Sequence, residues 1–576
     1  MHGQCEGWTA GIILMMVLMR VHDLGEWMAF RKTSCREIFS YFAGEVLDRL
    51  DESMRSFLLH TAFLPKIHAD AANHLAGAGD AEKRLSSLAR NQYFTTRSAG
   101  KESVYQYHQL FREFLIATAK AEWTAAKLQC IQRKAAELLE DQGQIEDAAG
   151  LLLDSPDWQG ILRLIQENAR SMISQGRYRT VEKWLRRIPE HFRDKEPWLW
   201  YWLGICRMPE DLQASRAALQ KGYTRFRKSD DIAGVFLSWS GIVETYSYEW
   251  GVMYPLDHWI AEMDTLLTLY PEFPSSEIEA RVILGMFFAL MYRQPDHPDM
   301  RLWEEKAWDL AFSDADLDIR VAVSSHLIMY FLGWRGHHTK AELLLNSLKI
   351  SLLPRSTKIS PLHEIIWRSM EGASLWFFNY FEKSHAALKE GIEKAEEYGI
   401  SIWNAMLLAL RGHLSVGERK TDTAKDCIER MGFILNTGRI LDISSYHFVC
   451  AGFELIQGRM PQAVAHIEAT LRYSRQSGTP TIHHFYLTGF ADLLLDMGDF
   501  EHAQKHIENI YNFCVKAYNE NLKTYCFWLW ARLNFDTRNE STGFKYLRTY
   551  LEHSRKYRIH NHHWWRSSVM AHLFVK

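Results

Sequence analysis

His108 is the residue of this chain whose type and setting most directly suggest binding chemistry. It stands beside apolar residues spaced by three, one, three and one, and this spacing predicts one stripe along a helix. The stripe consists of Tyr107, Leu110, Phe111, Phe114 and Leu115. An imidazole N–H near the start of a helix can donate to a phosphate oxygen, and protonation strengthens such a contact. His108 is therefore a candidate for binding an anion, and the alternative is a histidine that packs between domains.

Other histidines come in pairs that lack the arrangement of metal ligands. His502 and His506 share a helix face, but the Glu of an HExxH motif and a third ligand are missing. The adjacent pairs, which point to different helix faces, are His337-His338, His483-His484 and His562-His563. The eight cysteines are scattered without CxxC spacing, and no GxSxG elbow occurs. The sequence thus predicts no metal site, no catalytic residue and no enzyme activity.

Aromatic clusters are a second group of candidates, because large rings can hold a small inducer or a peptide. The chain has 21 Trp and 13% aromatic residues. The clusters are Trp239, Tyr246, Tyr248 and Trp250, then Tyr330 and Trp334, then Trp376, Phe377 and Phe378. The alternative for each cluster is packing between helices, and this is the interpretation we favour.

Charge and hydropathy exclude several classes of function. The formal net charge of −3, with 67 basic and 70 acidic residues, does not favour a large nucleic-acid surface, so no direct nucleic-acid binding is expected. The longest apolar run, from Ala10 to Met19, is too short to span a bilayer and lacks the flanks of a signal peptide. We therefore expect no membrane segment and a cytoplasmic location.

Residues 37–121 predict the small module that positions His108. Helices are expected over residues 38–50, 52–59 and 69–75 and around 85–89. Residues 93–96 and 104–107 predict a hairpin about a turn at 98–101. Helices, a hairpin and a further helix describe a winged-helix-like domain, in which His108 follows the second hairpin strand.

From residue 122 onward a short sequence motif recurs at intervals near 40 residues. Gly is followed five positions later by Ala at Gly143/Ala148, Gly336/Ala341, Gly458/Ala463 and Gly498/Ala503. Looser copies lead from Asn379-Tyr380-Phe381 to Ala386, from Gly417 to Ala424 and from Arg538-Asn539-Glu540 to Phe544. Gly can adopt the left-handed conformation that ends a helix, and Ala lets the next helix approach closely. This period predicts a solenoid of about eleven helix pairs, with irregular lengths over the Pro-containing region 190–330.

Four segments occur in an order that resembles a known family. They are Gly7-Trp8-x-Ala10-Gly11, Tyr41-Phe42-Ala43-x-Glu45-Val46-Leu47-Asp48-Arg49-Leu50, Phe57-Leu58-Leu59-x-Thr61 and Tyr105-x-Tyr107-His108-x-Leu110-Phe111-Arg112-x-Phe114-Leu115. They resemble the middle of the MalT-type (LuxR-family, ATP-dependent) regulators, the signal-transduction ATPases with numerous domains (STAND). Residues 564–571 resemble a segment that precedes the effector domain in some members. The resemblance implies a P-loop ATPase, a winged-helix domain, a tetratricopeptide-like sensor and a DNA-binding domain.

The sequence departs from that family at two points. No GxxxxGK[ST] motif occurs, and no helix-turn-helix with a basic recognition helix follows residue 560. The resemblance implies a remnant helical segment of an ATPase module at 1–36, a winged-helix-like domain at 37–121 and a MalT-like tetratricopeptide superhelix at 122–576. It also implies that His108 senses the ADP phosphate, which here requires an ATPase domain in trans. We expect no ATP or ADP cofactor in this chain alone.

The expected fold is mostly α, a small winged-helix module followed by a tetratricopeptide-like α–α superhelix. The expected function is that of a non-catalytic sensor and protein-interaction region of a STAND-type transcriptional regulator. Its partner would be a protein or a small-molecule inducer held in the groove of the superhelix. The alternative is a free-standing tetratricopeptide scaffold, or a non-functional fragment, without a role in transcription.

Overall fold

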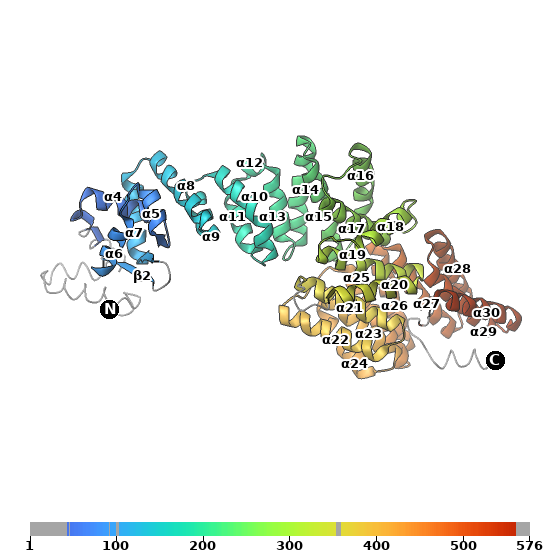
Figure 1. The fold of residues 1–576 in the computed structure, drawn as a ribbon. Coiled ribbons are helices and arrows are strands. Elements are labelled where there is room, and N and C mark those ends of the chain that lie inside the picture. Colours follow the sequence, from blue (N-terminus) through green and yellow to red (C-terminus); the bar gives the residue numbers. More distant parts are fainter. Residues whose placement is uncertain are drawn as a thin grey trace. The chain divides into compact units, whose positions relative to one another are not determined.

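A computed structural model describes residues 43–44, 47–91, 93–98, 103–352, 359–559 and 561. The chain divides into two compact units, Met1–Trp202 and Leu203–Lys576. Figure 1 labels the α-helices of both units and the strand β2. The predicted segment at 1–36, the Tyr41-Phe42 pair and residues 564–571 lie outside the described residues.

The first unit begins with a winged helix. Its elements are α4 (Glu52–Thr61), β1 (Ile67–His68), α5 (Ala69–Ala76), α6 (Ala81–Arg90), β2 (Thr95–Ser98), β3 (Val104–Tyr107) and α7 (Gln109–Glu122). The predicted hairpin is confirmed as β2 and β3, which pair antiparallel. The sheet has a third strand that was not predicted, since β1 pairs with the other side of β3 to give the order β1-β3-β2. Two residues are too few for an alternating pattern to reveal a strand.

The core of the winged helix joins β3 to the helices around it. Tyr107 is buried, and its hydroxyl forms a 2.7 Å hydrogen bond with the hydroxyl of Thr61 on α4. Phe111 and Leu115 on α7 are also buried. The prediction that Tyr107 shares a helical stripe with them is wrong, because Tyr107 ends β3 and α7 begins at Gln109. Tyr107 still meets Phe111, edge to face at 5.8 Å.

Helical hairpins follow the winged helix. In the first unit they are built from α8 (Ala125–Asp141), α9 (Ile145–Asp154), α10 (Trp158–Ser174) and α11 (Tyr178–Arg187), with a short α12 (Glu190–Arg193) after them. In each hairpin the turn contains a left-handed glycine, Gly143 (φ 71°) or Gly176 (φ 79°). These glycines end the first helix of each pair, as the sequence predicted for Gly143.

The second unit is a longer stack of the same kind. Its helices are α13 (Pro197–Arg207), α14 (Leu212–Ser229), α15 (Ile232–Glu249), α16 (Leu256–Leu269), α17 (Ser276–Arg293), α18 (Met300–Ala311), α19 (Leu317–Met329), η1 (Tyr330–Arg335), α20 (His338–Leu352), α21 (Pro361–Phe377), α22 (Phe381–Tyr398), α23 (Asn404–Gly417), α24 (Thr421–Met431), η2 (Gly432–Asn436), α25 (Ile440–Ile456), α26 (Met460–Ser477), α27 (Pro480–Met497), α28 (Phe500–Ala517), α29 (Glu520–Asp536) and α30 (Glu540–Tyr557). With the two hairpins of the first unit, the described residues contain eleven helix pairs. The predicted fold, mostly α with a winged helix and a helical-repeat superhelix, is confirmed.

The repeated Gly and Ala positions have the predicted roles. Gly336, Gly458 and Gly498 have φ between 70° and 75°, within the left-handed region. The small residue five positions later is fully buried in each case, at Ala341, Ala463 and Ala503. A methyl group there lets the second helix lie close against the first.

The looser copies were predicted only partly in the right register. The left-handed residues are Asn379 (φ 63°) and Arg538 (φ 62°), which lie in the predicted turns, and Arg419 (φ 58°) in place of Gly417. The small residues five positions later are Ser384, Ala424 and Gly543, which are buried, whereas the predicted Ala386 and Phe544 are exposed. The register was missed because Arg can occupy the left-handed conformation at a modest energetic cost, so no glycine marks the turn.

Replacing Arg538 by Gly is expected to stabilise the second unit by about 1 kcal/mol, because Gly adopts the left-handed conformation without a Cβ clash. Arg538 is exposed, so little packing is lost. Urea-induced unfolding followed by circular dichroism measures the change. Arg538→Ala is the matched control and should show no such gain, since Ala keeps the Cβ. Equal stabilities of the Gly and Ala variants would contradict the explanation.

Residues far apart in the sequence of the second unit lie side by side. The Arg439 guanidinium donates to the carbonyl oxygens of Tyr248 at 2.7 Å and Ile402 at 2.9 Å. Other contacts of this kind are Leu441 N to Trp250 O (3.0 Å), Met253 N to Ser477 O (2.7 Å), Arg293 Nη1 to Gly478 O (3.1 Å), Asn521 Nδ2 to Gly333 O (3.4 Å) and Asn561 Nδ2 to Trp376 O (3.3 Å). We call this row of contacts the seam. It shows that the stack of hairpins returns against itself, and α27 also packs against α17.

Candidate functional site

His108 is positioned by the junction between β3 and α7. It is the N-cap residue of α7, its backbone N–H donates to Phe94 O at 2.7 Å, and its carbonyl accepts from Arg112 N at 3.0 Å. These two backbone bonds fix the residue where the strand turns into the helix. The side chain is half-buried. The structure therefore holds His108 at the start of a 14-residue helix, in the setting that the sequence predicted.

Burial lowers the pKa of His108 below its usual value. The imidazole is therefore neutral at neutral pH, and it can donate one N–H to an acceptor. The positive end of the α7 dipole favours an anion in the same place. Arg112, one turn further on, donates instead to the carbonyl oxygen of Ala62 at 2.8 Å and so serves the packing of α7 on the winged helix.

The aromatic clusters are placed mainly in the packing between helices, which confirms the favoured interpretation. Trp239 is fully buried and donates from its indole N–H to Trp259 O at 2.8 Å. Five more of these aromatic side chains are at most 8% exposed, and they are Tyr246, Trp250, Tyr330, Trp334 and Phe377. Trp250 also stacks on Trp403 within the seam, with ring centres 6.2 Å apart. Of the proposed rings, Phe378 lines a cavity.

The paired histidines have individual structural contacts. His502 contacts the carboxylate of Asp499 at the start of α28, with a 2.9 Å distance from Nδ1 to either oxygen. His484 stacks on Phe513 at 4.0 Å, and His338 is buried against Phe377 and Phe378. In the part of the chain that the structure describes, no three His, Cys, Asp or Glu side chains are placed to hold a metal ion. The His562-His563 pair lies outside that part.

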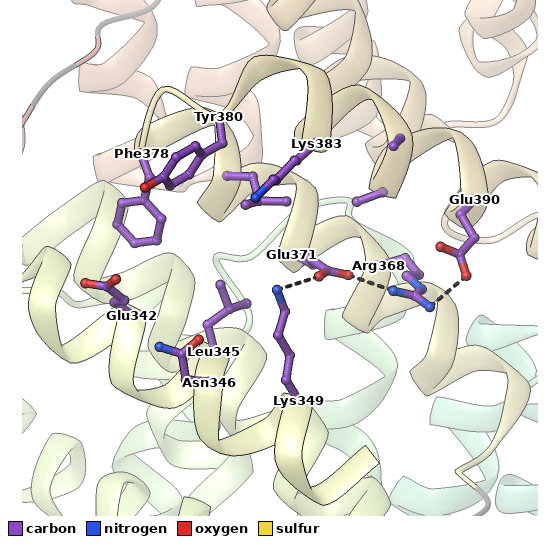
Figure 2. A pocket seen from close by; sticks show the side chains of 13 residues that line it. Glu342, Leu345, Asn346, Lys349, Arg368, Glu371, Phe378, Tyr380, Lys383 and Glu390 are labelled. Carbon is purple, nitrogen blue, oxygen red and sulfur yellow. Dashed lines mark hydrogen bonds and ion pairs between the residues drawn. The ribbon is translucent and has the colours of Figure 1, made fainter. Parts of the chain in front are cut away.

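A cavity of about 440 Å³ lies between α20 and the α21–α22 hairpin. We call it the α20–α22 pocket, and Figure 2 shows its lining. The lining residues are Glu342, Leu345, Asn346, Lys349, Arg368, Glu371, Leu375, Phe378, Tyr380, Lys383, Ala386, Ala387 and Glu390. The link between α20 and α21 runs from 353 to 360 and is the longest between consecutive described helices of the second unit.

One side of the pocket is an ion-pair network. Glu371 accepts from Lys349 and from Arg368, each at 2.8 Å, and Arg368 also reaches Glu390 at 2.7 Å. Glu371 is 10% exposed, and its ion pairs with Lys349 and Arg368 offset the free-energy cost of burying the carboxylate. The other side is apolar and aromatic, with Phe378 and Tyr380 at one end. The pocket thus presents fixed charges beside ring faces, an arrangement that can orient a small ligand.

Sequence reasoning missed the α20–α22 pocket. Its charged residues lie on amphipathic helices, and in the sequence they look like the residues of any solvent-exposed helix face. Phe378 was the single lining residue proposed, as part of an aromatic cluster. The signal available in the sequence is the long polar link after Leu352, which departs from the short links elsewhere in the array.

Comparison with known proteins supports the family assignment of the winged helix. Residues 43–127 match the family model of the MalT winged helix domain. The chain therefore contains a MalT-type winged helix followed by helical repeats, as the sequence resemblance predicted. The match includes His108 and all of the three-stranded sheet.

A solved structure similar to this chain is that of a Signal Transduction ATPase with Numerous Domains (STAND) protein with a tetratricopeptide repeat sensor, from Pyrococcus horikoshii. Sequence identity is 13%, the TM-score is 0.47, and the match covers 76% of this chain and 65% of that chain. This chain thus spans less than two thirds of that protein. Separately, none of the described helices is both long and apolar enough to cross a membrane.

Proposed function

We propose that this chain is the non-catalytic sensor and protein-interaction region of a cytoplasmic STAND-type transcriptional regulator. An inducer or a protein partner binds in the groove of the helical repeats. Binding alters how the winged helix docks on an ATPase domain. The observation that carries the proposal is a MalT-type winged helix continued, in one chain, by eleven helix pairs.

A non-catalytic role is supported by the raised pKa values of two buried cysteine thiols. Burial raises the pKa of Cys427 to about 11 and that of Cys450 to about 12. A thiol is a nucleophile only as the thiolate, so these two groups are unreactive at neutral pH.

His108 is the residue through which this chain would sense a nucleotide. In the proposed complex, ADP is held by an ATPase domain in trans, and the His108 N–H donates to one of its phosphate oxygens. This chain supplies no Gly-rich phosphate loop of its own. The proposal therefore assigns nucleotide affinity to the partner and nucleotide sensing to His108.

The test is binding of the full chain to the isolated ATPase module of a MalT-type regulator, measured by biolayer interferometry with ADP, with ATP and without nucleotide. We expect tighter binding with ADP, and His108→Ala should weaken that binding roughly tenfold, the value of one charge-assisted hydrogen bond. Gln109→Ala, at the exposed neighbouring position, is the matched control. Equal binding under all three conditions would count against the proposal, as would micromolar affinity of this chain alone for ATP.

A further inference from the structure

We propose that the α20–α22 pocket binds a small organic anion with a planar apolar body, a ligand class that rests on the proposed sensor function. The proposal combines three observations, which are an uncommitted cation, an exposed aromatic ring and a cavity of suitable size.

The uncommitted cation is Lys383 on α22. Lys349 and Arg368 are already neutralised by Glu371 and Glu390. Among the described residues, Lys383 makes no ion pair, and its ammonium group lies 5.3 Å from the centre of the Tyr380 ring. Figure 2 shows the Lys383 side chain extending into the pocket. An anionic group bound beside it would gain an opposite charge without displacing an existing ion pair.

The apolar part of the site is formed by Phe378, Tyr380 and Leu345. Tyr380 lines the cavity and is 55% exposed, so much of its side chain is in contact with solvent. Leu345 is buried and forms part of the wall contributed by α20. A flat apolar group placed between the rings and this wall would remove the Tyr380 ring face from water. The charge of Lys383 adjoins this surface, so the ligand should carry its anion next to its ring.

The size of the cavity limits the ligand. A volume of about 440 Å³ lies within the range of sites for small molecules and is too small for a folded domain. A free aromatic acid and the carboxyl-terminal aromatic residue of a peptide share the required chemistry. The two sources are distinguished by the competitors used in the test.

The pocket adjoins the segment that follows α30. Glu342, at the rim, lies 3.8 Å from Arg558, and Asn561 donates to the carbonyl oxygen of Trp376. Trp376 belongs to the same helix as Arg368 and Glu371. The pocket is therefore close to residues 558 and 561, which follow α30.

The test uses the full chain and the fluorescent probe 8-anilinonaphthalene-1-sulfonate, which carries an anion on a planar ring system. We expect saturable binding that Lys383→Glu weakens roughly tenfold by replacing attraction with repulsion. Tyr380→Ala should weaken it severalfold. Lys389→Glu changes the same charge on the exposed face of α22, outside the pocket, and should leave the dissociation constant within twofold.

Competition identifies the source of the anion. Displacement of the probe by phenylpropionate indicates a free acid, and displacement only by a phenylalanine-ended tripeptide with a free carboxylate indicates a peptide terminus. Wild-type affinity in both pocket variants would overturn the proposal, and so would an equal loss in Lys389→Glu. These outcomes leave the proposed function untouched, because nucleotide-dependent binding of the winged helix to an ATPase module is measured separately and does not use this pocket.

Discussion

Replacing Arg532 by Met is expected to lower the free energy of unfolding of the second unit by about 3–5 kcal/mol, the cost of breaking a buried ion pair from one side. Arg532 is 7% exposed and joins α29 to α27 through the carboxylates of Asp492 and Asp496. It also lies 3.6 Å from Asp536. Asp492 is itself 5% exposed, so removing the guanidinium leaves a buried negative charge without its counter-ion. Urea-induced unfolding at pH 7.5 measures the effect.

Two further variants separate the lost ion pair from the lost packing. Arg301→Met breaks an ion pair with Glu305 in which the side chains are 85% and 64% exposed, and it should change stability by less than about 1 kcal/mol. Adding Asp492→Asn and Asp496→Asn to Arg532→Met removes the stranded charges and should restore part of the loss. If the triple variant is no more stable than Arg532→Met, the loss of stability comes from lost packing and not from the unpaired carboxylates.

Lowering the pH from 7.5 to 5.5 is expected to destabilise the second unit by about 4 kcal/mol, roughly 1 kcal/mol for each of four histidines. Burial lowers the pKa of these half-buried imidazoles to about 4, and they are His326, His413, His447 and His483. The unfolded chain, with an ordinary histidine pKa near 6.5, binds more protons than the folded chain over this interval. Stability is therefore complete above the unfolded value and is lost as the pH falls from about 6.5 toward 4.

The contribution of a single histidine can be isolated. His413 packs against Phe448 with ring centres 5.0 Å apart, so Leu can fill its place. His413→Leu should reduce the difference in unfolding free energy between pH 7.5 and pH 5.5 by roughly 1 kcal/mol. A wild-type stability that is equal at the two pH values would contradict the prediction, since it would mean that these imidazoles titrate normally in the folded state.

The winged helix could be predicted from the sequence because its elements are local. Helical spacing around Phe111 and the β-branched and aromatic runs before His108 each lie within a few residues, and the hairpin joins neighbours in the chain. β1 pairs with β3 over a long stretch of sequence, with Ile67 opposite Tyr105 and His68 opposite Val104, and no local pattern encodes that pairing. The period of the helical array was equally accessible, because several turns contain a left-handed glycine that is followed five positions later by a small buried residue.

The candidate site could be predicted only in part. The position of His108 between β3 and α7 could be predicted, because the hairpin strand before it and the helix after it are both visible in the sequence. The α20–α22 pocket was missed because Lys349 and Lys383 stand on different helices, and their approach depends on how far two hairpins separate. Arg532 illustrates the same limit, since its three carboxylate neighbours lie up to 40 residues away and its burial follows from the stacking of α27 on α29.

The seam should change how the second unit unfolds when one hairpin opens. In an open solenoid each repeat touches only its neighbours, so stability is a sum of nearest-neighbour terms and the ends fray first. Here the Arg439 side chain donates a hydrogen bond to the carbonyl oxygen of Tyr248, 191 residues away in the sequence. The Asn521 side chain donates to the carbonyl oxygen of Gly333, 188 residues away. Opening one hairpin between these points must also break contacts of the seam, so we expect the second unit to unfold more cooperatively than an open solenoid does.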